Sequence, residues 1–316
     1  MPTLNFRKGT TVSGITLYEN SAFCANTPIA VRYHGATYYA DTTTASGSYN
    51  SKLRVRIPGQ SEVRSIATQS LLHPIAFQGV NARLGFPFGQ PPIGDTEGIV
   101  LNGYITEGLT LSNESFVAVV IGVMHNGTKE TNSANSVTYA IRRDNYNVRN
   151  IAFVDSNYNN SLTTGNTFHM NTAAYSGKNW RTCYMSSTVM SKFYNALPQA
   201  VKNVIVYTQK SAYSPNDNDV LKNYSHVFLL SEFELRGKCV QSHITESVYQ
   251  QQYEYFKNNN DFALTRHDSN GVPAAYWTRS QYKSNATEFL FVDESGAFSR
   301  KREYYSLGVM PCFNVG

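Results

Sequence analysis

The chain has 316 residues, with 27 Lys and Arg against 22 Asp and Glu, and a formal net charge of +5. Aromatic residues make up 13% and charged residues only 16% of the chain, whereas an ordinary soluble domain has about 25% charged residues. This composition excludes an intrinsically disordered chain, and the 41% of hydrophobic residues can form the core of one large domain or two ordinary ones.

No segment has the length and apolarity of a membrane-spanning helix. The longest apolar run, Ser115–Met124, is far shorter than the roughly 20 residues that such a helix needs. It is rich in Val, which favours a buried strand. The first residues, MPTLNFRKGT, lack the apolar core and the cleavage site of a secretory signal. We therefore expect neither a signal peptide nor membrane insertion.

The N-terminal segment is typical of an all-β meander. Two strand-like runs in Pro28–Thr44 meet at His34 and Gly35, which suit a hairpin turn. Lys52–Ile57 alternates basic and apolar residues, as an amphipathic strand does. Gly and Pro are frequent in Leu71–Asp95, which indicates a linker or a long loop. We predict an all-β domain over residues 1–95 and a second domain over residues 96–316.

The second domain mixes strands with helices, so we assign it to the α+β class. Apolar residues recur every fourth position in Met185–Leu197, which predicts a helix that Pro198 ends. A second helix is predicted over Thr245–Lys257, with Val248 and Phe256 on one face. Strands are predicted at Ile99–Tyr104, Phe116–Met124, Ile151–Val154, Val204–Val206, Val227–Leu230, Ala275–Arg279, Glu288–Val292, Ala297–Ser299 and Gly308–Asn314.

Motifs of catalysis and metal binding are scarce in the sequence. P-loop, GxGxxG, GxSxG and HExxH patterns are absent. Asn216–Asp219 resembles the start of a calcium loop but lacks its later Gly and Glu, so a plain turn is favoured. We expect no cofactor, no metal and no catalytic residue, although a Ser–His–acid triad needs only to meet in space. The cysteines form no CxxC pair, so we expect free thiols at Cys24, Cys183, Cys239 and Cys312.

A short basic cluster, Arg300–Arg302, lies just before the pair Tyr304 and Tyr305. Basic side chains interleaved with aromatic ones bind anionic ligands through charge and stacking. The net charge of +5 is too modest to favour nucleic acid as the partner. Two alternatives remain, which are a solvated loop and a contact surface for an anionic cell-surface ligand.

Five segments resemble, in order, those of a large family of phage tail and firmicute proteins with a C-type-lectin-like fold. The strongest joins Tyr276–Ser280 (YWTRS) to Gly308–Phe313 (GVMPCF), similar to the family's W-x-R-S … G-V-x-P-x-F ending. The others are Val120–Asn126, Trp180–Pro198, Val227–Leu235 and Gln252–Lys257. Met310 stands where the family has Arg, and the sugar-binding triplets of calcium-dependent lectins are absent. Calcium-mediated sugar binding is therefore not implied.

The resemblance implies a C-terminal C-type-lectin-like domain, with two helices around short mixed strands, at residues 96–316. It implies a non-enzymatic, homotrimeric phage tail-tip protein of the major-tropism-determinant type, located on the virion, in which retroelements diversify some members. Its partners would be a host cell-surface receptor, protein or glycan, and a tail fibre or baseplate protein docked on the N-terminal collar. The alternatives are a bacterial surface adhesin and a glycan-degrading tail enzyme, for which Glu232 and Glu234 are the nearest acid pair in sequence.

In this family the ligand-facing residues lie between the W-x-R-S strand and the final strand. We assign Trp277 and Phe313 to the core, and Gly308 and Pro311 to backbone constraints. The Phe side chains of Glu288–Val292 belong either to the core or to an exposed binding patch. We predict a shallow site with Tyr and Arg contacts, formed by Tyr282, Lys283, Asn285, Phe289, Phe291, Arg300, Arg302, Tyr304 and Tyr305.

Overall fold

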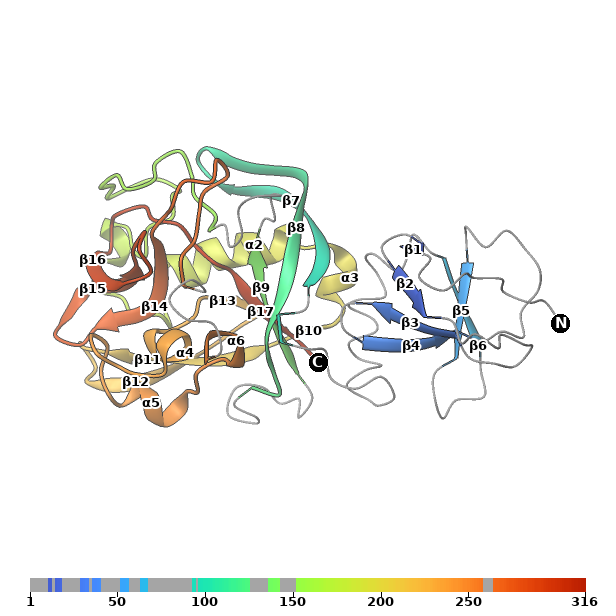
Figure 1. The fold of residues 1–316 in the computed structure, drawn as a ribbon. Coiled ribbons are helices and arrows are strands. Elements are labelled where there is room, and N and C mark those ends of the chain that lie inside the picture. The colour runs from blue at the N-terminus through green and yellow to red at the C-terminus, as the bar shows by residue number, and fades with distance from the viewer. Residues whose placement is uncertain are drawn as a thin grey trace. The chain divides into compact units, whose positions relative to one another are not determined.

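The chain divides into two compact units, Met1–Glu97 and Gly98–Gly316 (Figure 1). The computed structural model describes the strands within residues 11–67 and then residues 93–94, 96–125, 136–142, 152–257 and 264–316. The division lies next to the domain boundary that the Gly- and Pro-rich stretch predicts. That stretch itself lies almost entirely outside the described residues, as do His34, Gly35 and Cys24.

The strands of the first unit form one sheet with the order β1-β2-β3-β4-β5-β6. Each strand pairs antiparallel with its neighbour in the chain, which is the connectivity of a meander. The alternating segment predicted at Lys52–Ile57 is β5. The bounds are β1 Thr11–Val12, β2 Ile15–Tyr18, β3 Ile29–Tyr33, β4 Ala36–Ala40, β5 Lys52–Arg56 and β6 Val63–Ala67.

The core of the second unit is built on a sheet with the order β10-β17-β9-β8-β7, in which β13 also pairs with β17. The C-terminal strand β17 lies inside this sheet, and all of its residues are buried. Its Phe313 ring stacks on Tyr139 of β9. The apolar run Ser115–Met124 falls in β8 except for the exposed Met124, and its central part is largely buried, as predicted. The bounds are β7 Thr96–Thr106, β8 Leu109–Val123, β9 Val137–Arg142, β10 Ile205–Val206, β13 Val227–Phe228 and β17 Cys312–Val315.

The helix predicted at Met185–Leu197 is confirmed. It begins with a π-helical turn, η4 (Met185–Val189), and continues as α2 (Met190–Ala196). The residues that predicted it, among them Met185 and Phe193, are buried, so the apolar stripe faces the core. Pro198 ends the helix because it lacks the N–H that would continue the ladder, and the short α3 (Gln199–Lys202) follows.

The single helix predicted over Thr245–Lys257 is wrong. The segment forms two short helices, α5 (Glu246–Tyr249) and α6 (Glu254–Lys257), separated by extended backbone at Gln250. The Gln250 amide donates to the carbonyl of Ser211, and its oxygen accepts from the Ser231 hydroxyl. These buried bonds override the helical periodicity, and Val248 is 63% exposed while Phe256 is buried.

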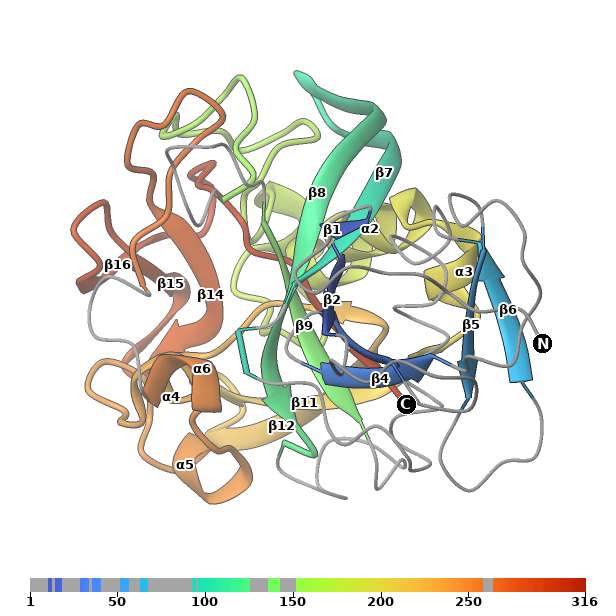
Figure 2. The ribbon, with the colours of Figure 1, turned by 45° about the vertical axis from the view of Figure 1, so that its right-hand side comes forward.

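A hairpin sheet and a ribbon complete the second unit. The three-stranded sheet has the order β14-β15-β16 and lies beside α4 (Glu232–Arg236) in both ribbon views (Figures 1 and 2). In the ribbon, β11 and β12 are joined by a turn in which Asn218 has φ 50°. The calcium-like segment Asn216–Asp219 forms this turn. The bounds are β11 Thr208–Ser214, β12 Asp219–Ser225, β14 Tyr276–Tyr282, β15 Asn285–Val292 and β16 Phe298–Arg302.

The described chain is therefore a mixed α+β structure, with mostly strands and few helices, as the sequence predicts. A further short 3-10 turn covers Ala173–Tyr175. Cys183, Cys239 and Cys312 are free thiols, in agreement with the prediction. In the part of the chain that the structure describes, the helices are too short or too polar to span a membrane.

Candidate functional site

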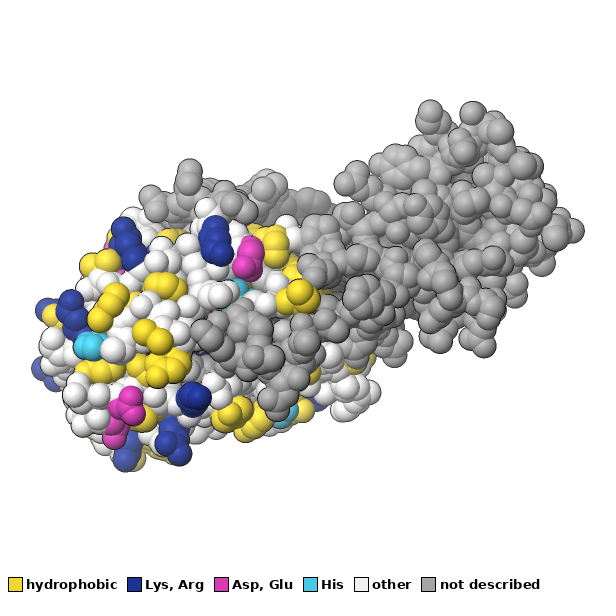
Figure 3. All heavy atoms as spheres, turned by 90° about the horizontal axis from the view of Figure 1, so that it is seen from below, with side chains coloured by type: hydrophobic (Ala, Val, Ile, Leu, Met, Phe, Trp, Pro, Cys, Tyr) yellow, Lys and Arg dark blue, Asp and Glu magenta, His cyan; other side chains and the backbone are white. Residues whose placement is uncertain are grey.

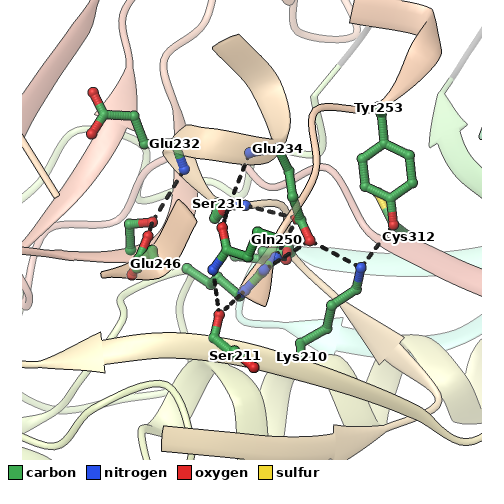
Figure 4. A network of polar contacts seen from close by, with 12 residues as sticks. Lys210, Ser211, Ser231, Glu232, Glu234, Glu246, Gln250, Tyr253 and Cys312 are labelled. Atoms are coloured by element: carbon green, nitrogen blue, oxygen red, sulfur yellow. Dashed lines mark hydrogen bonds and ion pairs between the residues drawn. The ribbon is translucent and has the colours of Figure 1, made fainter. Parts of the chain in front are cut away.

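Three charged side chains, one each from β11, α4 and β14, meet in the interior. Figure 4 labels two of them, Lys210 and Glu234. The Arg279 guanidinium forms a two-point contact with the Glu234 carboxylate, with Nη2 2.8 Å from Oε1. The Lys210 ammonium lies 3.0 Å from the same Oε1. All three side chains have no exposed surface. We call Lys210, Glu234 and Arg279 the buried ion cluster.

The buried ion cluster stabilises the fold. Burial opposes the charge of Glu234, but Arg279 and Lys210 outweigh burial and hold the pKa of its carboxyl well below the usual range. The remaining donors of the two cations reach the carbonyl oxygens of Leu229 and Ser211 and the Tyr253 hydroxyl. Because every partner belongs to the protein, the cluster fixes β14 to α4 and β11.

The neighbouring carboxylates of Glu232 and Glu246 also accept hydrogen bonds from groups of the protein. Glu232 accepts from the backbone N–H groups of Val240 and Ser242, at 3.1 and 2.8 Å, and from Arg236. Ser280 donates to Glu246 and accepts from the Glu232 backbone N–H. Glu232 and Glu234 lie on a helix with 0% exposure. The idea that this acid pair attacks a glycan is therefore wrong, since neither carboxylate meets solvent.

Above pH 4.5, we expect the titration of Glu246 to dominate the pH dependence of the free energy of unfolding. Burial raises the pKa of Glu246 to about 7, against the effects of the Tyr213 N–H, Arg279 and the Ser280 hydroxyl. In the unfolded chain Glu246 loses its proton near the usual pKa of 4.5, whereas the folded state keeps it up to about pH 7. Between these two pH values the folded state therefore binds more protons than the unfolded chain. The free energy of unfolding therefore falls as pH rises through this window, by roughly 3 kcal/mol.

Glu246→Gln tests this expectation, because an amide can accept from Tyr213 and pair with Ser280 without titrating. The free energy of unfolding of the variant, measured by denaturant titration, should exceed that of the wild type at pH 8 and match it near pH 4. The control variant Glu288→Gln, at a half-buried carboxylate near the surface, should keep the wild-type slope. An unchanged slope between pH 4.5 and 7 in Glu246→Gln would contradict the assignment.

The two ends of the W-x-R-S … G-V-x-P-x-F pattern contact each other. Trp277 and Phe313 are buried, as predicted. The Trp277 indole N–H donates to the carbonyl of Phe168 at 2.8 Å. The Gly308 backbone forms two hydrogen bonds at the start of β14. Its carbonyl accepts from the Trp277 N–H, and its N–H donates to the carbonyl of Ala275, the residue just before the strand. A Cβ at Gly308 would lie 2.9 Å from the Ala275 oxygen, which explains the glycine.

Gly308→Ala is expected to lower the free energy of unfolding by about 1–3 kcal/mol, because the added methyl group forces the backbone of β14 to shift. Thermal unfolding followed by Trp fluorescence measures the effect. The control Thr164→Ala removes a methyl and a hydroxyl group from an exposed position and should stay within about 0.5 kcal/mol of the wild type. Equal stability of the two variants would show that β14 tolerates the methyl group.

Several of the predicted site residues gather on one side of the hairpin sheet. The Arg300 guanidinium lies 3.9 Å from the centre of the Tyr282 ring, and its Nε is 3.5 Å from the Glu288 carboxylate. Arg302 pairs in register with Glu288, so its side chain lies on the same side. We call Tyr282, Glu288, Arg300 and Arg302 the hairpin face. Both arginines are exposed.

Other predicted site residues lie on the opposite side of the sheet. Because side chains alternate along a strand, Lys301 points away from Arg300. Its ammonium lies 4.6 Å from the centre of the Tyr305 ring and 5.8 Å from that of Phe291, and Tyr304 stacks on Tyr305. We call Phe291, Lys301, Tyr304 and Tyr305 the Lys301 side. The structure thus divides the predicted site between two faces.

Three predicted residues belong to neither group. Phe289 is fully buried, so it is a core residue and its prediction as a ligand contact is wrong. It sits on the central strand of the hairpin sheet, where the rest of the unit covers it. Lys283 lies in the turn between β14 and β15, and Asn285 is the first residue of β15. Lys283 donates to the Val240 carbonyl, and the Asn285 oxygen accepts from the N–H and hydroxyl of Thr287.

One surface feature has no counterpart in the sequence prediction. Figure 3 shows hydrophobic side chains gathered on the face that is seen from below, where α5 lies. Ile244 is 64% exposed and Tyr249 is 42% exposed. The helical pattern over Thr245–Lys257 concealed this patch, because a continuous helix would have turned Val248 towards the core together with Phe256.

A family model described as "Domain of unknown function (DUF6273)" matches residues 131–316. The match covers more than half of the chain and includes β9 and all later strands and helices. Comparison with the curated proteins gave no match, and comparison with the solved structures gave none either. The matched region contains the buried ion cluster, the hairpin face and the Gly308 contact. This chain therefore belongs to the DUF6273 family.

Proposed function

We propose that this chain is a non-enzymatic phage tail receptor-binding protein that binds a host cell-surface ligand through the hairpin face. The observation that carries the proposal is a firmly attached sheet that presents two solvent-exposed arginines beside the half-buried ring of Tyr282. On one side the buried ion cluster fixes β14. At the end of β16 the buried Glu303 accepts from Asn171, Ser176 and Gly177. Such fixed attachment allows the outer side chains to vary without loss of fold.

The chemistry of the hairpin face suits an anionic or strongly polar ligand. It carries two arginines against the single carboxylate of Glu288, whose contact with Arg300 is long at 3.5 Å. The Arg300 guanidinium stacks on the Tyr282 ring. This contact restricts the Arg300 side chain before binding, so less conformational entropy is lost when a ligand binds. Arg and Tyr are the residues that most often dominate binding energy at interfaces. A carboxylate or phosphate of a cell-surface protein or glycan would pair with the arginines.

The sequence resemblance supports the rest of the proposal. The five ordered segments suggest a C-type-lectin-like fold for the second unit and a location at the phage tail tip. In this proposal the first unit is a collar that forms a homotrimer and docks on a tail fibre or baseplate protein. Three linked sites would raise the apparent affinity by on the order of 10²–10⁴. A bacterial surface adhesin would use the same face and differ in location.

Binding of the labelled full-length chain to a panel of bacterial strains tests the proposal. We expect saturable binding to at least one strain, displaced by an excess of unlabelled protein. Cells that are exposed to the protein, washed at high salt and tested again should bind as much as before, because a binding protein leaves its ligand intact. Loss of binding capacity after exposure would indicate an enzyme, and no binding to any strain would contradict a receptor-binding role.

A further inference from the structure

A second candidate site lies between the helix η4–α2 and the ribbon strand β12. It is a groove of about 310 Å³, and its residues come from elements other than β14, β15 and β16. We call it the aromatic groove and define it by the lining residues that matter most, which are Arg181, Tyr194, Tyr207, Tyr224, Ser225 and His226. A π-helical turn such as η4 is rare and is often found at functional sites.

A continuous row of rings forms one wall of the aromatic groove. Tyr207 and Tyr224 are 56% and 50% exposed, with ring centres 5.9 Å apart and planes inclined by 19°. The His226 ring lies 4.8 Å from that of Tyr207 and stacks on Tyr194 at 4.4 Å. The Tyr224 hydroxyl donates to the side-chain oxygen of Gln209, which orients its ring. The row presents fixed, half-exposed aromatic faces.

Polar groups without internal partners stand beside these rings. The buried hydroxyl of Ser225 has no hydrogen-bond partner within the described residues, although such groups are normally satisfied. Arg181 is exposed at the rim, and the lining includes no Asp or Glu. Burial lowers the pKa of His226, so its neutral ring offers one donor and one acceptor. A ligand that stacks on aromatic rings and also forms hydrogen bonds would therefore complement the groove.

We propose that the aromatic groove binds a saccharide, with the C–H face of one pyranose ring against Tyr207 and Tyr224. Sugar hydroxyls would bond to Ser225 and His226, and an acidic substituent, where the sugar has one, would pair with Arg181. The volume is at the lower end of the range for small-molecule sites, so the groove accommodates a short saccharide. This inference does not rest on the hairpin face and would stand if that proposal failed.

Saturation-transfer NMR on the full-length chain tests the saccharide site. The probes are the methyl glycosides of glucose, galactose, mannose, rhamnose, N-acetylglucosamine and glucuronic acid. We expect transfer to the ring C–H protons of at least one probe, and a tighter Kd for the glucuronide than for the glucoside. Absence of transfer to every probe would overturn the proposal.

Variants locate the bound sugar and separate the roles of the groove residues. Tyr207→Ala combined with Tyr224→Ala should raise the Kd at least tenfold, whereas Tyr249→Ala, which removes an exposed tyrosine on α5, should leave it unchanged. Arg181→Ala should abolish the preference for the glucuronide and keep glucoside binding. Trp fluorescence verifies that each variant is folded. Equal Kd values for the Tyr207/Tyr224 variant and the Tyr249 variant would place the sugar elsewhere and overturn the proposal.

Discussion

Glu234→Gln is expected to lower the free energy of unfolding of the second unit by roughly 3–5 kcal/mol, the range for breaking a buried ion pair. The change removes the negative charge of the carboxylate that both Lys210 and Arg279 contact in the interior. For a unit of this size each kcal/mol lowers Tm by about 2–4 °C. Thermal unfolding should therefore occur on the order of 10 °C lower.

Trp fluorescence is well suited to this measurement. The chain has two tryptophans, and both, Trp180 and Trp277, are 1% exposed in the second unit. Glu288→Gln is the matched control, because it neutralises a carboxylate that pairs with an arginine at the surface of the same sheet. We expect that control to stay within about 0.5 kcal/mol of the wild type. If Glu234→Gln and Glu288→Gln lowered the free energy of unfolding by similar amounts, the buried ion cluster would stabilise the fold no more than the surface pair does.

The acid range provides a second signature of Glu234. Its folded pKa is depressed, so its contribution to stability is present above the unfolded pKa near 4.5 and is lost as pH falls below it. This sign is opposite to that of Glu246. The wild type should lose stability below pH 4.5 more steeply than Glu234→Gln, and parallel curves in acid would contradict the depressed pKa.

Arg300→Ala combined with Arg302→Ala is expected to weaken binding to a strain that binds the wild type by at least about 30-fold. This factor corresponds to the loss of about 2 kcal/mol that defines an interface hot spot. Both side chains are exposed, so the fold should remain intact. Because the contacts are charged, wild-type binding should also weaken as salt increases.

Two further variants decide which face carries the ligand. Lys222→Ala removes an exposed cation from β12 and should bind like the wild type, which excludes a general effect of charge. Tyr304→Ala with Tyr305→Ala removes the stacked rings of the Lys301 side and should retain most of the binding. If the tyrosine variant loses binding and the arginine variant keeps it, the ligand contacts the Lys301 side instead.

Local patterns predicted local structure well. The spacing of Met185, Val189 and Phe193 predicted a helix and its buried face, because an isolated amphipathic helix repeats at that interval. Trp277 and Phe313 were placed correctly in the core. The same spacing rule failed at Thr245–Lys257, where Gln250 is held by buried bonds to Ser211 and Ser231, which local periodicity cannot reveal.

The candidate site was harder to predict than the fold. Lys210 and Arg279 lie 24 and 45 residues from Glu234 in sequence, and no local pattern connects residues so far apart. Arg300, Lys301 and Arg302 looked like one basic cluster, yet the alternation of the strand divides them between two faces. The aromatic groove also was not predicted, since Tyr207 lies just before β11, Tyr224 lies in β12, and the two are far apart in sequence.

Amide hydrogen exchange of the full-length chain, with and without envelope fragments from a binding strain, tests the central claim most directly. Contact at the hairpin face should slow exchange in the exposed turn and strand segments between Tyr282 and Arg302. Fragments from a strain that does not bind serve as the control. Protection in that segment is the result that we predict, and unchanged exchange there, with the fragments bound elsewhere on the chain, would contradict a receptor site on the hairpin face.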